Sequence, residues 1–125
     1  MGENDIGRRI LGCALKVHQA LGPGLLESVY ETCLAHELTK ARMTFDRQRS
    51  LPVIYDGLLI DPGYRLDLLV ESLVVLEIKA VDLVNDIHRA QLLSYMKLGG
   101  YRLGYLLNFN VARMRDGITR MANGL

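Results

Sequence analysis

Cysteine is scarce in this chain, which has only Cys13 and Cys33 among its 125 residues. Both lie in apolar segments with helical spacing, and neither belongs to a CxxC pattern. The three histidines form no HxxxH pattern, so a zinc site and a disulfide framework are both excluded as organising features. We therefore expect both cysteines to be buried free thiols.

Long hydrophobic runs are missing as well. No apolar stretch approaches the roughly 18 residues of a membrane-spanning helix, and the first residues, MGENDIGRRI, contain no apolar signal segment. These absences predict a cytoplasmic protein with no membrane partner. A strong excess of one charge is also missing, because the net charge is +1, whereas domains that bind nucleic acid are usually basic.

What the chain has is a large apolar share, since 50% of its residues are hydrophobic and 23% are charged. This composition is typical of a globular protein and argues against disorder. The length suits one domain, and no repeat, low-complexity stretch or linker divides it. We therefore expect residues 1–125 to form a single domain with a proper core.

The spacing of the apolar residues changes along the chain. Two helices are predicted first, and Gly22-Pro23-Gly24 between them stops or kinks a helix. Strands follow, with a hairpin turn at Asp56-Gly57 and a turn or bulge at Asp61-Pro62-Gly63. The expected helices cover residues 4–22, 25–41 and 85–100, the expected strands cover 43–55, 58–60, 64–70, 73–81 and 101–110, and a last hairpin surrounds Asp116-Gly117. This order predicts an α/β domain with a mixed sheet flanked by helices.

Three ionisable side chains interrupt the most apolar hairpin, RLDLLVESLVVLEIKA, at Asp67, Glu77 and Lys79. An unpaired buried charge is strongly unfavourable, so three such groups need a common reason. Strand side chains alternate, which places Glu77 and Lys79 on one face. One explanation is an edge strand with a wet face on which these two residues pair, and the other is a functional site.

The turn of this hairpin decides where Asp67 lies. If residues 71–73 form an odd-length loop, Val70 pairs with Val74 and Asp67 lies opposite Glu77 on the same face. Cβ atoms that oppose each other are about 4.5–5.5 Å apart, and like charges there repel. A divalent cation would remove that repulsion, and two carboxylates with a backbone carbonyl suit Mg²⁺ or Mn²⁺. The lysine one step along the strand would then stabilise negative charge on a phosphate.

Asp67, followed by Glu77-Ile78-Lys79 on the next strand, resembles the motif of the PD-(D/E)XK nuclease superfamily, although Leu66 stands where that motif has proline. Residues 24–30, GLLESVY, read G-x-x-E-x-x-Y and resemble the GxxExxY family within that superfamily. The segments LGPGLLESVYE, RLDLLVE, LEIKA, QLLSY and LLNFN follow the order of that family, so the resemblance extends from about residue 5 to residue 121.

The resemblance implies a restriction-endonuclease-like αβββαβ core and a set of site residues. It makes Asp67 and Glu77 metal ligands together with the backbone of Ile78, and it makes Lys79 the catalytic lysine. It also makes Glu27 an acidic group supplied by the N-terminal helix, which holds a second metal or a bound water. From the residue alone, Glu27 fits equally the first turn of a helix, where the helix dipole favours a carboxylate.

On the helix that follows the hairpin, Gln91 and Tyr95 match the Q-x-x-x-Y motif of related recombination-type nucleases, where these residues support the site. His88 shares their helical face, with a solvated or hydrogen-bonded histidine as the alternative to a catalytic one. Gln91 and Tyr95 also fit ordinary surface and core positions. Tyr30 belongs to an apolar stripe, which favours core packing.

Together these features predict Mg²⁺- or Mn²⁺-dependent hydrolysis of phosphodiester bonds in nucleic acid, with DNA as the favoured substrate and in-line attack by a metal-activated water. The alternative is a catalytically inactive nuclease-fold module for binding or assembly, because a fold does not guarantee activity. The intact acidic and lysine positions favour the nuclease, and the nearly neutral charge favours the alternative. The small size and an exposed sheet edge further predict a two-fold homodimer.

Overall fold

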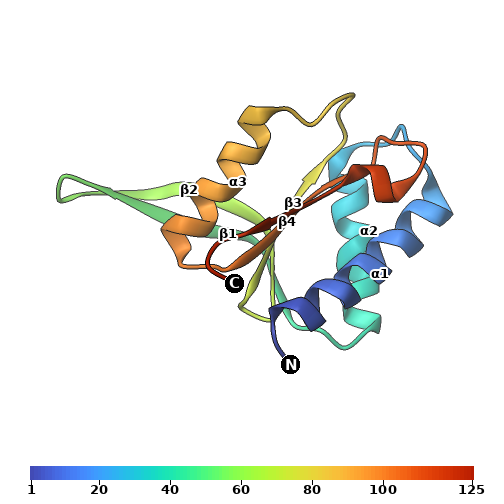
Figure 1. The fold of residues 1–125 in the computed structure, drawn as a ribbon, viewed down its shortest axis with the longest axis horizontal. Coiled ribbons are helices and arrows are strands. Elements are labelled where there is room, and N and C mark those ends of the chain that lie inside the picture. Colours follow the sequence, from blue (N-terminus) through green and yellow to red (C-terminus); the bar gives the residue numbers. More distant parts are fainter.

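The computed structural model describes residues 1–125, and its elements can be followed in Figure 1. In chain order they are α1 (Glu3–Leu21), α2 (Glu27–Lys40), β1 (Phe45–Tyr55), β2 (Leu58–Val70), β3 (Val74–Lys79), α3 (Asp86–Gly99), β4 (Leu103–Asn108), the 3₁₀ helix η1 (Met114–Gly117) and β5 (Ile118–Ala122). None of the helices combines the length and the apolar composition needed to span a membrane.

The five strands form one sheet in the order β1-β2-β3-β4-β5. β3 and β4 are parallel, and the other neighbouring pairs are antiparallel. α3 connects the two parallel strands, as a crossover between parallel strands requires. The predicted mixed sheet and the αβββαβ core are therefore confirmed.

Two segments differ from the expected boundaries. β2 is one continuous strand where two were expected, and the register with β1 shifts between Leu51 and Val53, so of the two alternatives at Asp61-Pro62-Gly63 the bulge is the one formed. The segment around Asp116-Gly117 does not form a separate hairpin. It forms η1, after which β5 pairs with β4. An isolated two-stranded hairpin is marginally stable, whereas the free edge of β4 gives β5 a place in the five-stranded sheet.

The sheet separates two hydrophobic cores. The larger core lies between the sheet and α1 with α2, and the smaller core lies between the sheet and α3. β3 contributes to both, since Leu76 packs in the larger core and Val75 packs in the smaller one. By alternation, Glu77 and Lys79 belong to the α3 side of the sheet.

Tyr30 ties the loop before α2 to the larger core. Its ring is fully buried and stacks on Phe109 with the ring centroids 4.6 Å apart. Its hydroxyl donates to the Gly22 carbonyl at 2.6 Å and accepts from the Leu25 N–H at 3.1 Å. Tyr30 therefore fixes the start of α2 relative to the sheet, in keeping with its expected packing role.

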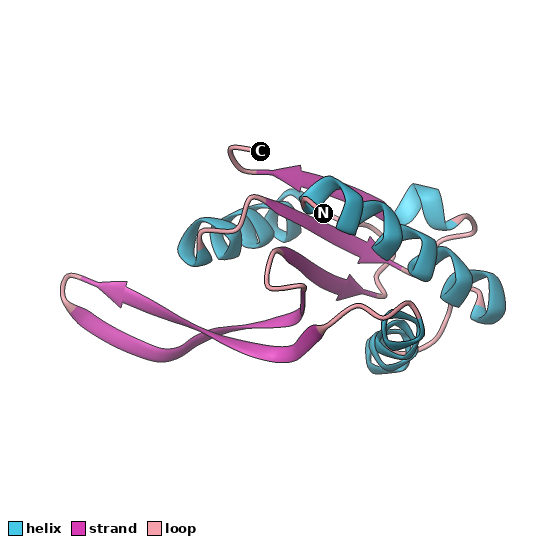
Figure 2. Ribbon diagram, turned by 90° about the horizontal axis from the view of Figure 1, so that it is seen from below, coloured by secondary structure: helices cyan, strands magenta, loops and turns pink.

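β2 belongs to the main sheet only at its C-terminal end. Only Leu68–Val70 pairs with β3, whereas the rest of the strand pairs with β1 alone. Residues 49–66 therefore form a two-stranded arm whose base packs against α3 and whose far end projects beyond the helices (Figures 1 and 2). The ionisable residues of interest lie at the base of this arm.

Candidate active site

Asp67 and Glu77 are neighbours where β2 separates from β3. The strands pair in the register predicted from the odd-length loop, and the backbone pairs end at Leu68 and Leu76. At the next position the Asp67 N–H lies 3.4 Å from Glu77 Oε1, and the Ile78 N–H donates to Asp67 Oδ2 at 2.7 Å. Beyond the last backbone pair, the side chains of Asp67 and Glu77 therefore connect the two strands by hydrogen bonds to backbone N–H groups.

Glu77 is buried, with 6% of its surface exposed. Burial, followed by the negative charge of Asp67 and a hydrogen bond with it, raises the pKa of Glu77 from 4.5 to about 9, and Lys79 opposes this shift only in part. The carboxyl of Glu77 consequently holds a proton at neutral pH. The predicted repulsion between the two acidic groups is thus expressed as proton uptake by the more buried one.

Gln48 links Asp67 to a further carboxylate on α2. Its Nε2 lies 3.0 Å from Glu31 Oε1 and 3.5 Å from Asp67 Oδ1. Gln48 lies between two residues of β1 that pair with the neighbours of Asp67 in β2, and its φ of 53° lies in the left-handed region, which is rare inside a strand. Strain of this kind is found most often where function requires a particular side-chain direction.

Glu31 is buried, and two side chains of β1 hold it. Arg47 donates to Glu31 Oε2 from Nε at 3.1 Å and from Nη2 at 3.0 Å, while Gln48 occupies the other oxygen. Three donors on its two oxygens give this buried carboxylate the partners it requires. α2, β1 and β2 are thereby joined in one polar network next to Glu77.

Glu27, the acidic residue expected at the site, lies on the surface instead. It is the first residue of α2, it is exposed, and its side chain forms no hydrogen bond or ion pair. No group of three His, Cys, Asp or Glu side chains is disposed to hold a metal ion, so Glu27 does not complete a three-carboxylate cluster with Asp67 and Glu77. The residue of α2 that reaches the network is Glu31, one helical turn further on.

Lys79 lies half-buried at the end of β3, on the same side of the sheet as Glu77. It forms no ion pair or side-chain hydrogen bond. The alternative explanation, an ion pair between Lys79 and Glu77 on a wet strand face, is therefore not what the structure shows. Its positive charge nevertheless acts on Glu77 and opposes the rise of the Glu77 pKa. Ile78 between them packs in the larger core, and its N–H is held by Asp67.

α3 brings Tyr95 to the same region. Burial, followed by the charges of Glu77, Tyr64 and Asp67, raises the pKa of the Tyr95 hydroxyl. Its ring packs against Tyr64 of the arm, with the ring centroids 4.6 Å apart. Tyr95 is thus close to both carboxyl groups, and it contacts the base of the arm.

The other polar residues of α3 are less engaged. Gln91 is exposed and its side chain forms no hydrogen bond. His88 belongs to the start of the helix, where its Nδ1 accepts the Asn85 N–H at 3.2 Å while its own N–H donates to Asn85 Oδ1 at 3.0 Å. His88 is therefore the hydrogen-bonded histidine that the sequence left as an alternative.

Glu31 and Tyr64 are the residues that sequence reasoning misses. Glu31 follows Glu27 by four positions and so shares its helical face, but the motif draws attention to Glu27 alone. Tyr64 stands just after the bulge, where nothing in the sequence pattern marks it. Gln48 had a detectable signal, since an antiparallel hairpin with its turn at Asp56-Gly57 brings it near Asp67.

The donor set at this site fits a hard divalent cation. Two adjacent carboxyl groups, one of them buried with a raised pKa, are oxygen ligands without an ion-pair partner. A positive ion beside them would favour the ionised form of Glu77. Asp67 and Glu77 are therefore the residues that would hold such an ion.

Comparison with known proteins agrees with this geometry. The sequence model of the PD-(D/E)XK nuclease superfamily matches residues 4–121, from α1 into β5. Searches among curated proteins and among solved structures give no match. The matched range contains the aspartate of β2 and the Glu77-Ile78-Lys79 segment of β3, in the order that the superfamily name describes. With nearly the whole chain matched and the mixed sheet in place, the chain belongs to the PD-(D/E)XK nuclease superfamily.

Proposed function

We propose that the chain hydrolyses phosphodiester bonds of nucleic acid with the help of Mg²⁺ or Mn²⁺, and that DNA is its favoured substrate. The observation that carries this proposal is the contact between Asp67 and Glu77, with Lys79 one step along the same strand face. Membership of the superfamily supports a nuclease-like reaction. Within the superfamily, the G-x-x-E-x-x-Y segment at residues 24–30 supports assignment to the GxxExxY family.

Asp67 and Glu77 would bind the cation, with the backbone carbonyl of Ile78 as a further oxygen ligand. A bound cation supplies Lewis-acid chemistry, because it lowers the pKa of water and neutralises charge on a phosphate oxygen. Glu77 must lose its proton to act as a ligand, since its pKa is about 9 without a cation. Asp67 is held in place by the Ile78 N–H and by Gln48.

Lys79 would act on the substrate. Its ammonium group has no carboxylate partner in the protein, so it is available for a phosphate oxygen on which negative charge develops in the transition state. Removing its side chain would take away that stabilisation and leave the carboxyl groups in place.

The surrounding residues would position this centre. Glu31 would supply the acidic group from α2 that was expected from Glu27. It would act on Asp67 through Gln48, which contacts both carboxylates. Tyr95 would support the site from α3, where it already lies close to Glu77. The exposed amide of Gln91 would be free to contact the sugar-phosphate backbone.

A cleavage assay with matched variants tests the proposal. Wild type, Lys79→Ala and Glu77→Ala are incubated with plasmid and single-stranded DNA in Mg²⁺ and in Mn²⁺, with Lys97→Ala as an exposed lysine control from α3. Cleavage by wild type and by Lys97→Ala, and its loss in the other two variants, is the expected result. Equal cleavage by wild type and Lys79→Ala would mean that the activity comes from elsewhere.

Melting curves in EDTA and in Mg²⁺ separate binding from chemistry. Mg²⁺ should raise the melting temperature of wild type and Lys79→Ala but not that of Glu77→Ala. If Mg²⁺ stabilises the wild type and no nucleic acid is cut, a metal-binding domain without catalysis replaces the nuclease.

A further inference from the structure

The far end of the arm exposes large apolar side chains to solvent. The exposed fractions are 71% for Ile54, 71% for Tyr55, 60% for Leu58 and 61% for Leu59. Tyr55 pairs with Leu58 and Ile54 pairs with Leu59, so the two pairs lie on opposite faces of the ribbon. We call these four residues the arm tip, and it is apolar on both faces.

An arm of this composition requires a cover. An antiparallel sheet is stable when one of its faces packs on a core and the other faces water. A two-stranded hairpin with both faces in water is marginally stable at best. The arm tip packs on neither hydrophobic core of its own chain. Contiguous exposed apolar surface on a folded protein marks an interaction site, so the arm tip is a surface for a partner.

The charge of the arm narrows the choice of partner. Between residues 50 and 64 the only charged residues are Asp56 and Asp61, and neither forms a hydrogen bond or an ion pair. Arg49 and Arg65 stand at the base of the arm, so only its outer part, residues 50–64, is acidic and is repelled by the phosphate groups of nucleic acid. The partner should therefore be a protein surface that combines an apolar hollow with an unpaired positive charge.

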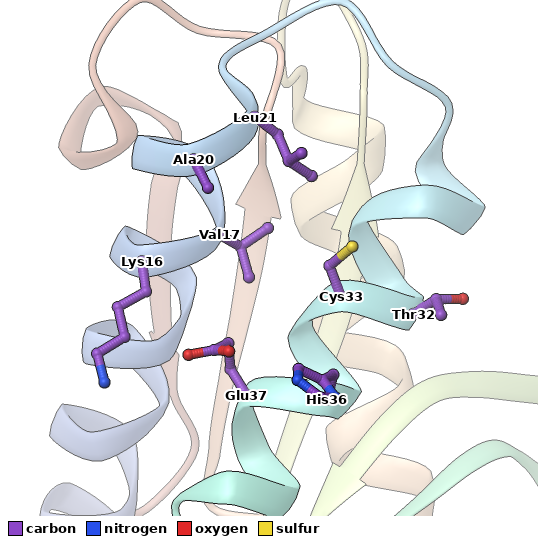
Figure 3. A pocket seen from close by; sticks show the side chains of 8 residues that line it. All are labelled: Lys16, Val17, Ala20, Leu21, Thr32, Cys33, His36 and Glu37. Carbon is purple, nitrogen blue, oxygen red and sulfur yellow. The ribbon is translucent and has the colours of Figure 1, made fainter.

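The chain itself carries such a surface between α1 and α2. A groove of about 580 Å³ lies there, within the range of ligand-binding cavities. Val17 and Leu21 of α1 and Cys33 of α2 point into it (Figure 3). The groove is lined by helices on the side of the sheet away from α3, so it is separate from the carboxylate site.

The groove offers one unpaired positive charge, whereas the outer part of the arm carries negative ones. Lys16 lies on its α1 side and forms no ion pair. Glu37, the acidic residue on its α2 side, is already paired with Lys40 at 3.3 Å. The unpaired charge at the groove is consequently positive, opposite to that of Asp56 and Asp61.

The arm tip and the groove lie at opposite ends of the molecule (Figures 1 and 2). A chain cannot fill its own groove, but two copies lying side by side and antiparallel can fill each other's. We propose that the protein forms a two-fold dimer in which the arm tip of each copy docks into the α1–α2 groove of the other. Such an interface is closed and uses the same two surfaces twice. It does not depend on the proposed nuclease function.

Light scattering on the full chain tests the dimer. Wild type should have twice the monomer mass of 14.0 kDa. The tip variant Ile54→Ser/Leu59→Ser and the groove variant Ala20→Arg should weaken the dimer by about tenfold or more. All three positions are exposed, so circular dichroism should show an unchanged fold. Leu83→Ser, an exposed apolar residue outside both surfaces, is the matched control and should remain dimeric.

A mixing experiment distinguishes reciprocal docking from other modes of association. The tip variant keeps an intact groove and the groove variant keeps an intact tip, so an equimolar mixture should recover a heterodimer with one of the two contacts. Lys16→Glu should weaken the wild-type dimer, and combining it with Asp56→Lys and Asp61→Lys should restore it. A groove variant that stays dimeric would indicate tip-to-tip pairing and overturn the proposal. A monomeric wild type up to about 100 μM would also overturn it and would assign the arm tip to a different protein.

Discussion

The backbone N–H of Ile78 donates to Asp67 Oδ2 at 2.7 Å, so a side-chain carboxylate takes the position that a backbone carbonyl of β2 would occupy in a continued ladder. Asp67 is therefore fixed by the strand next to it and not by its own strand alone. This contact holds one oxygen of Asp67 beside Glu77, and most of the measurable behaviour of the site follows from that closeness.

The stability of the metal-free protein should depend on pH through Glu77. The pKa of Glu77 is about 9 in the folded protein, whereas the ordinary value for a glutamate, expected in the unfolded chain, is 4.5. Between these pH values the folded state keeps a proton that the unfolded chain has lost. The free energy of unfolding should therefore fall as the pH rises through this range. Glu77→Gln stays neutral and should flatten the fall, as melting curves in EDTA would show. Glu27→Gln, an exposed carboxylate control, should keep the slope of wild type.

Cation binding should release a proton. Glu77 is protonated at neutral pH, and only its ionised form is a ligand. The apparent affinity for Mg²⁺ should therefore rise by about tenfold per pH unit below a pH of about 9. Calorimetry in two buffers with different ionisation enthalpies measures the proton directly. Equal heats in both buffers would show that Glu77 takes no part in binding.

Gln48 should matter more than Gln91, although the sequence motif favours Gln91. Gln48→Ala removes the amide between Glu31 and Asp67 and should cost about 1 kcal/mol of stability together with some Mg²⁺ affinity. Gln91→Ala removes an exposed side chain without a partner and should change stability by no more than about 0.5 kcal/mol. Denaturant unfolding and calorimetry on both variants check this. Indistinguishable results would remove Gln48 from the site.

Gln48→Gly distinguishes the effect of losing the side-chain amide from the effect of backbone strain at this position. Glycine adopts a φ of 53° without strain, so this change relieves the backbone and still removes the amide. Mg²⁺ affinity should therefore fall as in Gln48→Ala, while stability falls less.

Glu31→Gln and Glu27→Gln form a second matched pair. Glu31→Gln weakens the contact with Arg47, whose side chain is 40% exposed, and should cost about 1 kcal/mol and reduce cleavage. Glu27→Gln should leave stability within about 0.5 kcal/mol of wild type. Chemical unfolding and initial cleavage rates measure both. A larger loss of cleavage in Glu27→Gln would return the acidic role on α2 to the first residue of that helix.

The pairing of β2 with β3 could be predicted from the sequence because strand alternation and loop length are local properties. A three-residue loop fixes Val70 opposite Val74, and the position of Asp67 next to Glu77 follows by counting. The mixed sheet could be predicted for a similar reason, since a helix between two strands implies a parallel crossover.

The choice between Glu27 and Glu31 could not be predicted in this way. Both residues lie on one face of α2, and the rise of about 1.5 Å per residue separates them by one turn. Which turn is level with Asp67 depends on how far the helix slides along the sheet. That depth is set by the stacking of Tyr30 on Phe109, which lies 79 positions later in the chain. The polar partners of Glu31 come from β1, and no short motif contains such contacts.

The division of β2 between two partners has a consequence for how the protein opens. Amide protons of Leu68–Val70 lie between β1 and β3 and should exchange with solvent only when the whole domain unfolds. Those of the arm are held by a single neighbouring strand, so in the absence of a partner they should exchange through local separation of the ribbon. Asp67 lies at the boundary between these two cooperative units, so the carboxyl groups of Asp67 and Glu77 are held by the more stable unit while the arm beside them can open separately.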